Sequence, residues 1–356
     1  MRIAVIGVGL IGGSIGMAAR QDGLAEVTGF VRKPGRGAEA IEVGAIDELA
    51  ESIPAAVESA EIVFCCASVG AMESVVDEAL AAAGPDTVVT DVGSTKQELF
   101  AAFGEDPRFI GGHPLAGSET AGVTNARADL YEGARWYLTP GPNASGLLLD
   151  RLQKFISSIG ARPMAIEAGE HDRAMAEVSH LPHVFANQLA RQGVDGTERL
   201  GALAPSLRDA TRVAGANPAI WQEIFATNRE ALTEAIGVAI EGLEEARAVI
   251  SSGDPDRIGA WQEEARKVRT RLSAVETEAG PTRELRVVVP NRPGVLAEVA
   301  LALGGAGVNI VDMSLDPAKD MSSGAISVWV AGESEARRAE EVLDGLGHPV
   351  TIPDQT

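Results

Sequence analysis

Hydrophobic and polar positions divide the chain into three segments with different periodicities. Residues 1–168 alternate Ala-rich amphipathic stretches with short apolar runs, among them RIAVIG, EIVFCCA and TVVTDVG. Continuous β-branched runs are typical of parallel strands buried on both faces, with helices covering the sheet. We therefore predict an α/β domain with a mostly parallel sheet over this segment.

The strand pattern then ends, and residues 169–280 carry apolar residues at helical spacing. The stretch WQEIFATNREALTEAIGVAIEGLEEARAVISSG places Ile224, Leu232, Ile236 and Ile240 at such positions. This pattern predicts an all-α domain, whose long apolar faces favour a homodimer formed through it.

A Gly-Pro break at residues 279–282 precedes the third segment, residues 284–353. The stretch ELRVVVPNRPGVLAEVALALGGAGVNIVDMSLD is followed by GAISVWVAG, a helical stretch from Ser334, and HPVTIP. The order β-α-β-β-α-β predicts one small ferredoxin-like α+β domain.

Charge and cysteine content restrict the partners and the compartment. The net charge is −21, and nucleic acid and anionic membranes both require a cationic surface, so we expect neither as a partner. No apolar run reaches the roughly 18 residues of a membrane span. Cys65 and Cys66 are adjacent on a predicted strand and point to opposite faces, which argues against a disulfide or metal pair. We expect reduced core cysteines in a cytoplasmic protein.

The first predicted strand runs directly into GVGLIGGS, where Gly7, Gly9 and Gly12 have G-x-G-x-x-G spacing. The first glycine permits a tight turn, the second lets the backbone approach a pyrophosphate, and the third lets the helix pack on the strand. Such a turn can be purely structural, but the strands and helix around it favour a dinucleotide-binding Rossmann domain. We predict cofactor contacts from this turn, including Leu10 and Ile11.

The end of the second strand bears on the choice of cofactor. An NAD site usually has Asp or Glu there, whereas GFVRKPGR places Val31 and Arg32 at that position, with Lys33 and Arg36 nearby. A guanidinium without a carboxylate suits a 2′-phosphate, so we favour NADP over NAD. The alternative is a solvated basic loop.

A histidine in IGGHPLAGSE is the candidate base. A nicotinamide enzyme that oxidises a carbinol must remove the hydroxyl proton, and His113 follows a predicted strand at the carboxyl edge of the sheet. Alone, it would be a structural strand-end residue; Ser94 of DVGSTK, at the same edge, favours catalysis. Lys96 opens the next helix, where a solvated role is the simple reading. Glu119 could orient an arginine or help close the pocket.

Several motifs occur in the order found in the prephenate and arogenate dehydrogenases of tyrosine biosynthesis, the TyrA family. They are GVGLIGGS, DVGSTK, GGHPLAGSE, EHDRAMAEVSHLPH and LRDATRVAGANPAIWQEI, and the chain resembles that family over roughly residues 1–280. The resemblance implies a Rossmann domain followed by a dimerising helical domain, with the active site between them. It also implies oxidative decarboxylation of prephenate to 4-hydroxyphenylpyruvate, or of arogenate to tyrosine.

The resemblance assigns roles to individual residues. His113 polarises or deprotonates the ring hydroxyl of the substrate, and Ser94 orients that hydroxyl. Loss of the carboxylate follows because it aromatises the ring, so no metal is required. Arg212 of RDATR binds the substrate, Asp209 supports it, and His183 contacts the side-chain carboxylate end.

Alternative readings remain for several of these positions. Arg212 could be a surface residue at a helix end, and His180 and His183 could be core or interface histidines, since no further ligands support a metal there. His171 could be structural, and Trp221 is read as a packing residue.

The chain departs from the family pattern at ASVGA, where a Pro commonly follows Ser or Thr; we assign Ser68 and Val69 as nicotinamide-side contacts. Two other functions stay open. One is a Rossmann-plus-helical oxidoreductase acting on 3-hydroxy acids or imines, and the other is a non-catalytic NADP-binding regulatory protein.

The third segment resembles the start of an ACT domain, a regulatory module that binds amino acids, in VPNRPGVLAEVALALGGAGVNIVDMS. A turn containing Asn291 and Gly294 leads into a helix whose free N–H groups can accept a carboxylate, and Asn309 begins the next strand. The resemblance implies tyrosine as a feedback effector bound by these residues. The alternative is a dimerisation module without a ligand.

Overall fold

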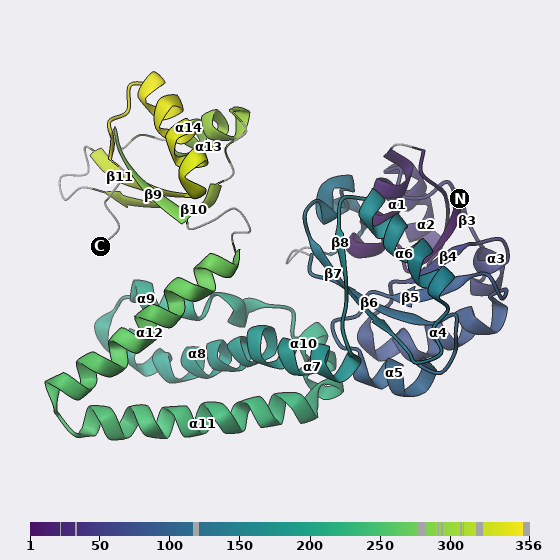
Figure 1. Ribbon diagram of the computed structural model, residues 1–356, viewed down its shortest axis with the longest axis horizontal. Coiled ribbons are helices and arrows are strands. Elements are labelled where there is room, and N and C mark those ends of the chain that lie inside the picture. Colours follow the sequence, from purple (N-terminus) through teal and green to yellow (C-terminus); the bar gives the residue numbers. More distant parts are fainter. Residues whose placement is uncertain are drawn as a thin grey trace. The chain divides into compact units, whose positions relative to one another are not determined.

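The computed structural model describes residues 1–21, 23–32, 34–116, 121–276, 282–290, 292, 295–306, 308, 310–317 and 323–351. The chain folds as two units, Met1–Gly242 and Leu243–Thr356. Figure 1 shows the elements of each.

The first unit is built on a five-stranded sheet in the order β3-β2-β1-β4-β5, and every neighbouring pair is parallel. Its strands are β1 (Arg2–Ile6), β2 (Glu26–Phe30), β3 (Glu48–Leu49), β4 (Ile62–Cys65) and β5 (Val88–Asp91). The chain order reverses between β1 and β4, and ligands of open α/β sheets bind at the carboxyl edge beside such a point. Only β3 was not predicted, since two residues carry no pattern.

A three-stranded sheet continues this layer in the order β6-β7-β8. Its strands are β6 (Ile110–Pro114), β7 (Arg135–Pro140) and β8 (Arg162–Ala165). A single parallel bridge between Val89 and Phe109 links it to β5. The predicted, mostly parallel sheet is therefore confirmed: β7 runs antiparallel to β6 and parallel to β8.

Helices cover both faces of the five-stranded sheet. They are α1 (Leu10–Gln21), α2 (Pro34–Glu42), α3 (Ile53–Val57), α4 (Val69–Ala82), α5 (Gln97–Phe103) and α6 (Gly146–Ser158), with short 3₁₀ turns at Val123–Asn125 and Ala128–Tyr131. One apolar cluster joins Ile3 and Phe64 to α1 and α6, and the other joins Ala4 and Cys65 to α3, α4 and α5. Cys66 packs against the first cluster. The two cysteines therefore face opposite sides, as predicted.

Helices follow from residue 168, as predicted. They are α7 (Ala168–Met175), a π-helical turn (Ala176–His180), α8 (Leu181–Leu200), α9 (Pro205–Ala210), a 3₁₀ turn (Arg212–Gly215), α10 (Pro218–Thr227) and α11 (Arg229–Ser251). Pro182 lies in the first turn of α8; because proline has no N–H to continue the α-helical ladder, the π-helical turn separates α7 from α8. Among the parts of the chain that the structure describes, no helix is long and apolar enough to cross a membrane.

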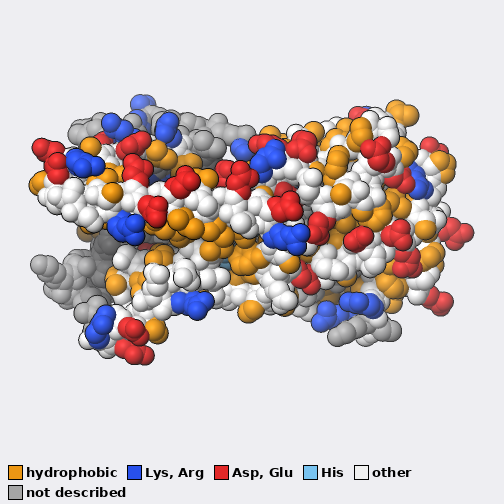
Figure 2. Space-filling model, turned by 90° about the horizontal axis from the view of Figure 1, so that it is seen from below, with side chains coloured by type: hydrophobic (Ala, Val, Ile, Leu, Met, Phe, Trp, Pro, Cys, Tyr) orange, Lys and Arg blue, Asp and Glu red, His pale blue; other side chains and the backbone are white. Residues whose placement is uncertain are grey.

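Apolar side chains are exposed along these helices. Phe185, Leu189 and Val194 of α8 are exposed, as are Val238 and Ile240 of α11. Figure 2 shows hydrophobic side chains gathered among charged ones on the face that it presents. Exposed aliphatic surface of this extent fits the predicted role in association.

The second unit contains α12 (Pro255–Glu276) and the predicted β-α-β-β-α-β order. The elements are β9 (Thr282–Pro290), α13 (Val295–Gly305), β10 (Ile310–Pro317), β11 (Ser323–Ala331), α14 (Gly332–Gly345) and β12 (Val350–Thr351). The sheet order is β10-β11-β9-β12, antiparallel throughout. Val287 of β9, Val299 of α13 and Leu343 of α14 share one apolar core. The expected effector residues Asn291, Gly294 and Asn309 lie outside the described residues.

Candidate active site

The glycine turn after β1 has the geometry that a dinucleotide requires. Gly7 has a φ of +102°, and a Cβ there would lie 2.5 Å from the carbonyl oxygen of Cys66. A Cβ at Gly12 would lie 2.3 Å from the carbonyl oxygen of Gly7, so α1 packs closely on the strand end. A Cβ at Gly9, in contrast, would meet nothing within 4 Å. The open space above Gly9 and the free N–H groups at the start of α1 fit a pyrophosphate.

The other predicted cofactor residues lie at the carboxyl ends of β1, β2 and β4. Leu10 and Ile11 begin α1 and are partly buried, and Arg32 is exposed two residues after β2 ends. Ser68 precedes α4 and Val69 is its first residue. Their positions agree with a cofactor that spans the switch point between β1 and β4.

Helix α10 contacts the start of α4. The Glu223 side chain accepts a hydrogen bond from the backbone N–H of Gly70, at 3.1 Å. The Thr227 hydroxyl, at the end of α10, lies 3.0 Å from the hydroxyl of Thr95. These contacts join the helical segment to the edge of the sheet where the cofactor residues lie.

His113 lies inside β6 and not in a loop after it, which corrects the sequence prediction. It pairs with Tyr137 of β7, and only 7% of its surface is exposed. Its Nδ1 lies 2.9 Å from Nε2 of His171. Burial lowers the pKa of His113 well below its ordinary value, and positive charge on His171, Lys96 and His180 would lower it further. The imidazole is therefore neutral at neutral pH.

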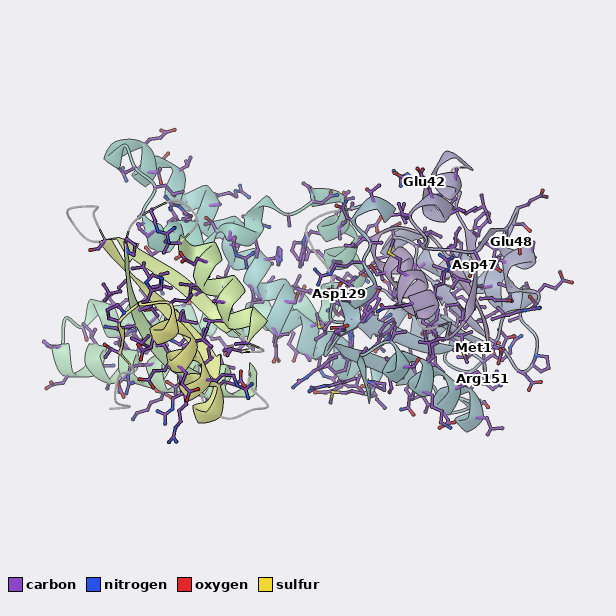
Figure 3. All side chains as sticks on the ribbon, turned by 90° about the horizontal axis from the view of Figure 1, so that it is seen from above. Met1, Glu42, Asp47, Glu48, Asp129 and Arg151 are labelled. Carbon is purple, nitrogen blue, oxygen red and sulfur yellow. The ribbon has the colours of Figure 1, made fainter. Side chains whose placement is uncertain are left out.

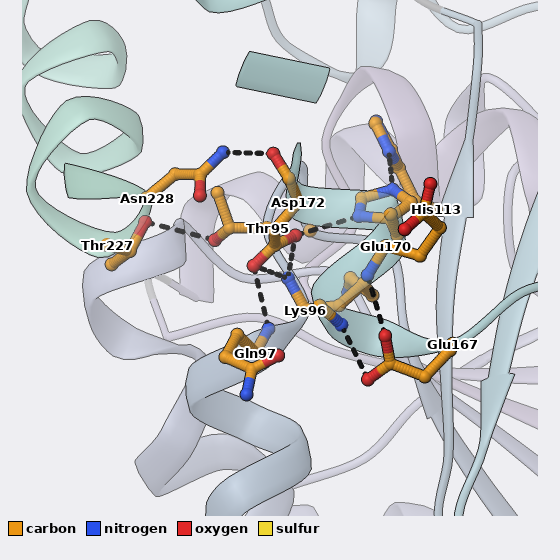
Figure 4. Close-up of polar contacts among 12 residues, drawn as sticks. Thr95, Lys96, Gln97, His113, Glu167, Glu170, Asp172, Thr227 and Asn228 are labelled. Carbon is orange, nitrogen blue, oxygen red and sulfur yellow. Dashed lines mark hydrogen bonds and ion pairs between the residues drawn. The ribbon is translucent and has the colours of Figure 1, made fainter. Parts of the chain in front are cut away.

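His171 and Asp172 form a buried pair next to His113, and Figure 4 shows Asp172 with the residues around it. Nδ1 of His171 lies 2.8 Å from Oδ1 of Asp172. The carboxylate of Asp172 also accepts the backbone N–H groups of Lys96 and Gln97, each at 2.8 Å. The motif EHDRAM contains both residues, but the sequence left a structural role open for His171 and indicated no role for Asp172.

Lys96 is buried, which rules out the simple reading of it as a solvated residue of the first helical turn. Its ammonium forms an ion pair with the carboxylate of Asp91 and donates to the carbonyl oxygen of Gly112 at 2.8 Å. Oδ1 of Asp91 also accepts the N–H of Gly112 at 3.0 Å. Burial lowers the pKa of Lys96, and the carboxylate of Asp91 opposes that shift. The pair fixes the end of β5 to β6 directly before His113.

Asn228 links Asp172 to a second histidine. Its Nδ2 donates to the backbone carbonyl of Asp172 at 2.8 Å and to Nδ1 of His180 at 3.0 Å. Burial lowers the pKa of His180 to about 4. His180 is therefore a neutral, hydrogen-bonded core residue.

The predicted substrate residues Arg212 and His183 lie near each other. The His183 ring stacks on Trp221, with centroids 3.4 Å apart. Burial lowers the pKa of His183, and the charge of Arg212 lowers it further. Arg212 is an exposed residue that begins the 3₁₀ turn after α9. Trp221 packs as predicted, and the ring that it packs against is a candidate substrate contact.

The structure gives less support to the roles predicted for three other catalytic or substrate-binding residues. Ser94 is half-buried in the loop after β5, and Asp209 is exposed near the end of α9. Glu119 lies outside the described residues. Within the described parts of the chain, no group of three or more His, Cys, Asp and Glu is arranged to hold a metal ion.

A depression of about 1050 Å³ lies at the opposite edge of the sheet. Met1, Glu26 and Glu61 line it at the amino ends of β1, β2 and β4, together with Asp47. Figure 3 labels Met1 and Asp47. The residues that line this depression include neither His113 nor the glycines of the turn, so it is not the candidate active site.

Comparison with known proteins agrees with this arrangement. Residues 15–165 match the prephenate dehydrogenase nucleotide-binding domain, residues 167–264 match the prephenate dehydrogenase dimerization domain, and residues 283–347 match the ACT domain.

Named relatives cover most of the chain. Prephenate dehydrogenase of Bacillus subtilis is 28% identical over 355 residues, covering 96% of this chain and 95% of the relative. Cyclohexadienyl dehydrogenase of Zymomonas mobilis is 33% identical over 285 residues, covering 76% of this chain and 95% of the relative.

Two solved structures are similar in fold and sequence. Prephenate dehydrogenase of Aquifex aeolicus, in complex with hydroxyphenyl propionate and NAD+, has a TM-score of 0.72 at 27% identity, covering 76% of this chain and 98% of that one. Synechocystis arogenate dehydrogenase has a TM-score of 0.70 at 25% identity, covering 76% of this chain and 100% of that one. The chain described here therefore belongs to the prephenate dehydrogenase family and carries an ACT domain after its dimerization domain.

Proposed function

We propose that this chain is an NAD(P)-dependent dehydrogenase that converts prephenate to 4-hydroxyphenylpyruvate by oxidative decarboxylation, a step of tyrosine biosynthesis. The observation that carries the proposal is His113, a buried imidazole at the carboxyl edge of the sheet whose pKa is lowered by burial. A neutral imidazole in a closed site is a suitable acceptor for a hydroxyl proton. Relatives named prephenate dehydrogenase support the choice of substrate.

The proton acceptor is Nε2 of His113, because Nδ1 already contacts His171. When bound over the glycine turn, a nicotinamide cofactor supplies the acceptor for the hydride that leaves the carbinol carbon. Nε2 takes the hydroxyl proton at the same time, and the burial of His113 limits the access of water to that nitrogen. The ring carboxylate then leaves as carbon dioxide, because its loss makes the ring aromatic.

Arg212 and His183 bind the two carboxylates of the substrate in this proposal. A chain with a net charge of −21 repels a dianion at long range, so a local guanidinium must capture it through paired N–H groups. Arg212 is close enough to His183 for its charge to lower the pKa of that histidine. Stacking on Trp221 fixes the position of the His183 ring. In this proposal Ser94 forms a hydrogen bond with the ring hydroxyl of the substrate. Only the family resemblance supports that role.

Four assays test the function. Purified protein is mixed with prephenate or arogenate and with NAD or NADP, and the reduced cofactor is followed by absorbance. We expect turnover of prephenate, with NADP preferred because Arg32 follows β2 at the position where an NAD site has a carboxylate. Turnover of arogenate alone would move the substrate to its amino analogue. No turnover with any of the four pairs would refute the proposal.

We also infer a homodimer formed through the helical domain and feedback inhibition by tyrosine through the ACT domain. The exposed apolar residues of α8 and α11 support the first inference, and the match of residues 283–347 supports the second. Sedimentation of the full chain measures the first. For the second, tyrosine should inhibit the full chain but not a chain that ends at residue 280, and equal inhibition of both would place the effector elsewhere.

A further inference from the structure

Three buried groups form a line that ends at the candidate base. His113, His171 and Asp172 are 7%, 1% and 3% exposed, and the two contacts between them measure 2.9 Å and 2.8 Å. His113 belongs to β6, whereas the other two belong to α7. The line therefore depends on how α7 packs against the sheet.

The direction of each hydrogen bond follows from the carboxylate end. The backbone N–H groups of Lys96 and Gln97 both donate to Asp172, so its side-chain oxygens act as hydrogen-bond acceptors. Nδ1 of His171 must then carry a hydrogen and donate it. Nε2 of His171 consequently has a free lone pair, so Nδ1 of His113 must donate to it. The only ring nitrogen of His113 without a hydrogen is Nε2.

We propose that His171 and Asp172 are positioning residues that hold His113 in the tautomer with a bare Nε2. The proposal rests on the proposed function, in which Nε2 takes the substrate proton. When it does so, His113 becomes an imidazolium whose Nδ1–H still donates to His171, and Asp172 stabilises that charge through the His171 ring. Both residues act through His113 without touching the substrate. The logic is that of a serine protease triad, in which a buried carboxylate fixes the tautomer of the base.

Asp172→Asn tests the carboxylate. An amide offers one oxygen, whereas the carboxylate accepts from three donors, two of which are backbone groups that cannot reverse. If the oxygen faces Gln97, the amide NH₂ faces His171, which reverses both imidazole tautomers and protonates Nε2 of His113. We expect kcat to fall by about 10²–10⁴-fold, as for a lost or misdirected general base, with both KM values within about threefold.

Glu167→Gln is the matched control. Glu167 lies at the start of the same helix, and its carboxylate accepts the N–H groups of Gly169 and Glu170. Its only hydrogen bond to the line is made by its backbone carbonyl, which accepts the backbone N–H of His171 and is unchanged by the substitution. Its substitution disturbs the α7 cap and leaves the tautomers unchanged, so kcat should stay within about twofold of the unmodified enzyme. Thermal unfolding of both variants measures their structural effects.

A second pair of variants decides the question if Asp172→Asn does not fold. In His171→Gln, the side-chain oxygen can accept from Nδ1 of His113 while the NH₂ group donates to Asp172, which preserves the tautomer. His171→Leu fills the same buried space without an acceptor. We expect the Gln variant to keep kcat within about tenfold of the unmodified enzyme and the Leu variant to lose at least about 10²-fold.

The pH profile gives a further readout. The groups that face His113 are His171, Lys96 and His180, and those near His171 also include Asp172. The loss in Asp172→Asn should persist at every pH on the neutral plateau, because a reversed tautomer is not corrected by titration. Equal kcat values for the Gln and Leu variants, or an Asp172→Asn enzyme that behaves like Glu167→Gln, would overturn the inference while the unmodified enzyme still turns over. Absence of turnover in the unmodified enzyme refutes the proposed function instead.

Discussion

Replacing Lys96 by methionine should destabilise the nucleotide-binding domain by about 3–5 kcal/mol. The side chains of Lys96 and Asp91 are both 0% exposed, so the rule for buried ion pairs applies and not the value of about 0–1 kcal/mol for surface pairs. Methionine fills the space of the lysine stem but leaves the Asp91 carboxylate without a cation. Asp91 keeps the N–H groups of Gly93 and Gly112, which places the expected loss near the lower value.

Urea unfolding followed by circular dichroism measures the loss in the free energy of unfolding, and two further variants serve as comparisons. Lys154→Met removes an exposed lysine paired with Asp150 and should cost no more than about 0.5 kcal/mol. Asp91→Asn combined with Lys96→Met removes both charges and should be less destabilised than Lys96→Met alone. A loss below about 1 kcal/mol in Lys96→Met would refute the reasoning, because it would show that water or another cation reaches Asp91.

Other predictions concern catalysis. His113→Ala should lower kcat by about 10²–10⁴-fold while cofactor binding, measured by fluorescence titration, persists; an unchanged kcat would remove His113 as the base. Arg212→Ala should raise the KM for prephenate with little change in the KM for the cofactor, and an unchanged substrate KM would exclude Arg212 from the site. Because burial lowers the pKa of His113, its neutral form persists below pH 6.5, so kcat/KM should stay level there and fall only at lower pH. A decline centred near pH 6.5 or above would contradict this.

The glycine turn could be predicted from the sequence because its requirements are local. Gly7 needs a positive φ, Gly12 needs close packing on its own turn, and both conditions leave a spacing that can be read directly. The order of the domains could be predicted for a related reason, since strand and helix periodicities are properties of short segments.

The interior of the site could not be predicted from local pattern. Lys96 resembles an ordinary residue at the start of a helix, and its burial depends on Asp91 and on Gly112 of another strand. The contact between His113 and His171 spans 58 positions along the chain, so no spacing indicates it. The strand before His113 was predicted, but it was expected to end at Gly112; it continues through His113 and Pro114 because these residues pair with Tyr137 and Trp136 of β7.

The burial of Lys96 also makes it a reporter for chemical labelling. An amine-reactive reagent should modify Lys154 rapidly in the folded protein, because that side chain is 76% exposed, whereas the Lys96 ammonium has no exposed surface. Lys96 can react only when the contact between β5 and β6 opens. Its labelling rate, compared with that of Lys154 in the same sample, therefore measures how often the contact between β5 and β6 beside His113 opens. Bound substrate or cofactor should slow the labelling of Lys96 if it stabilises that contact.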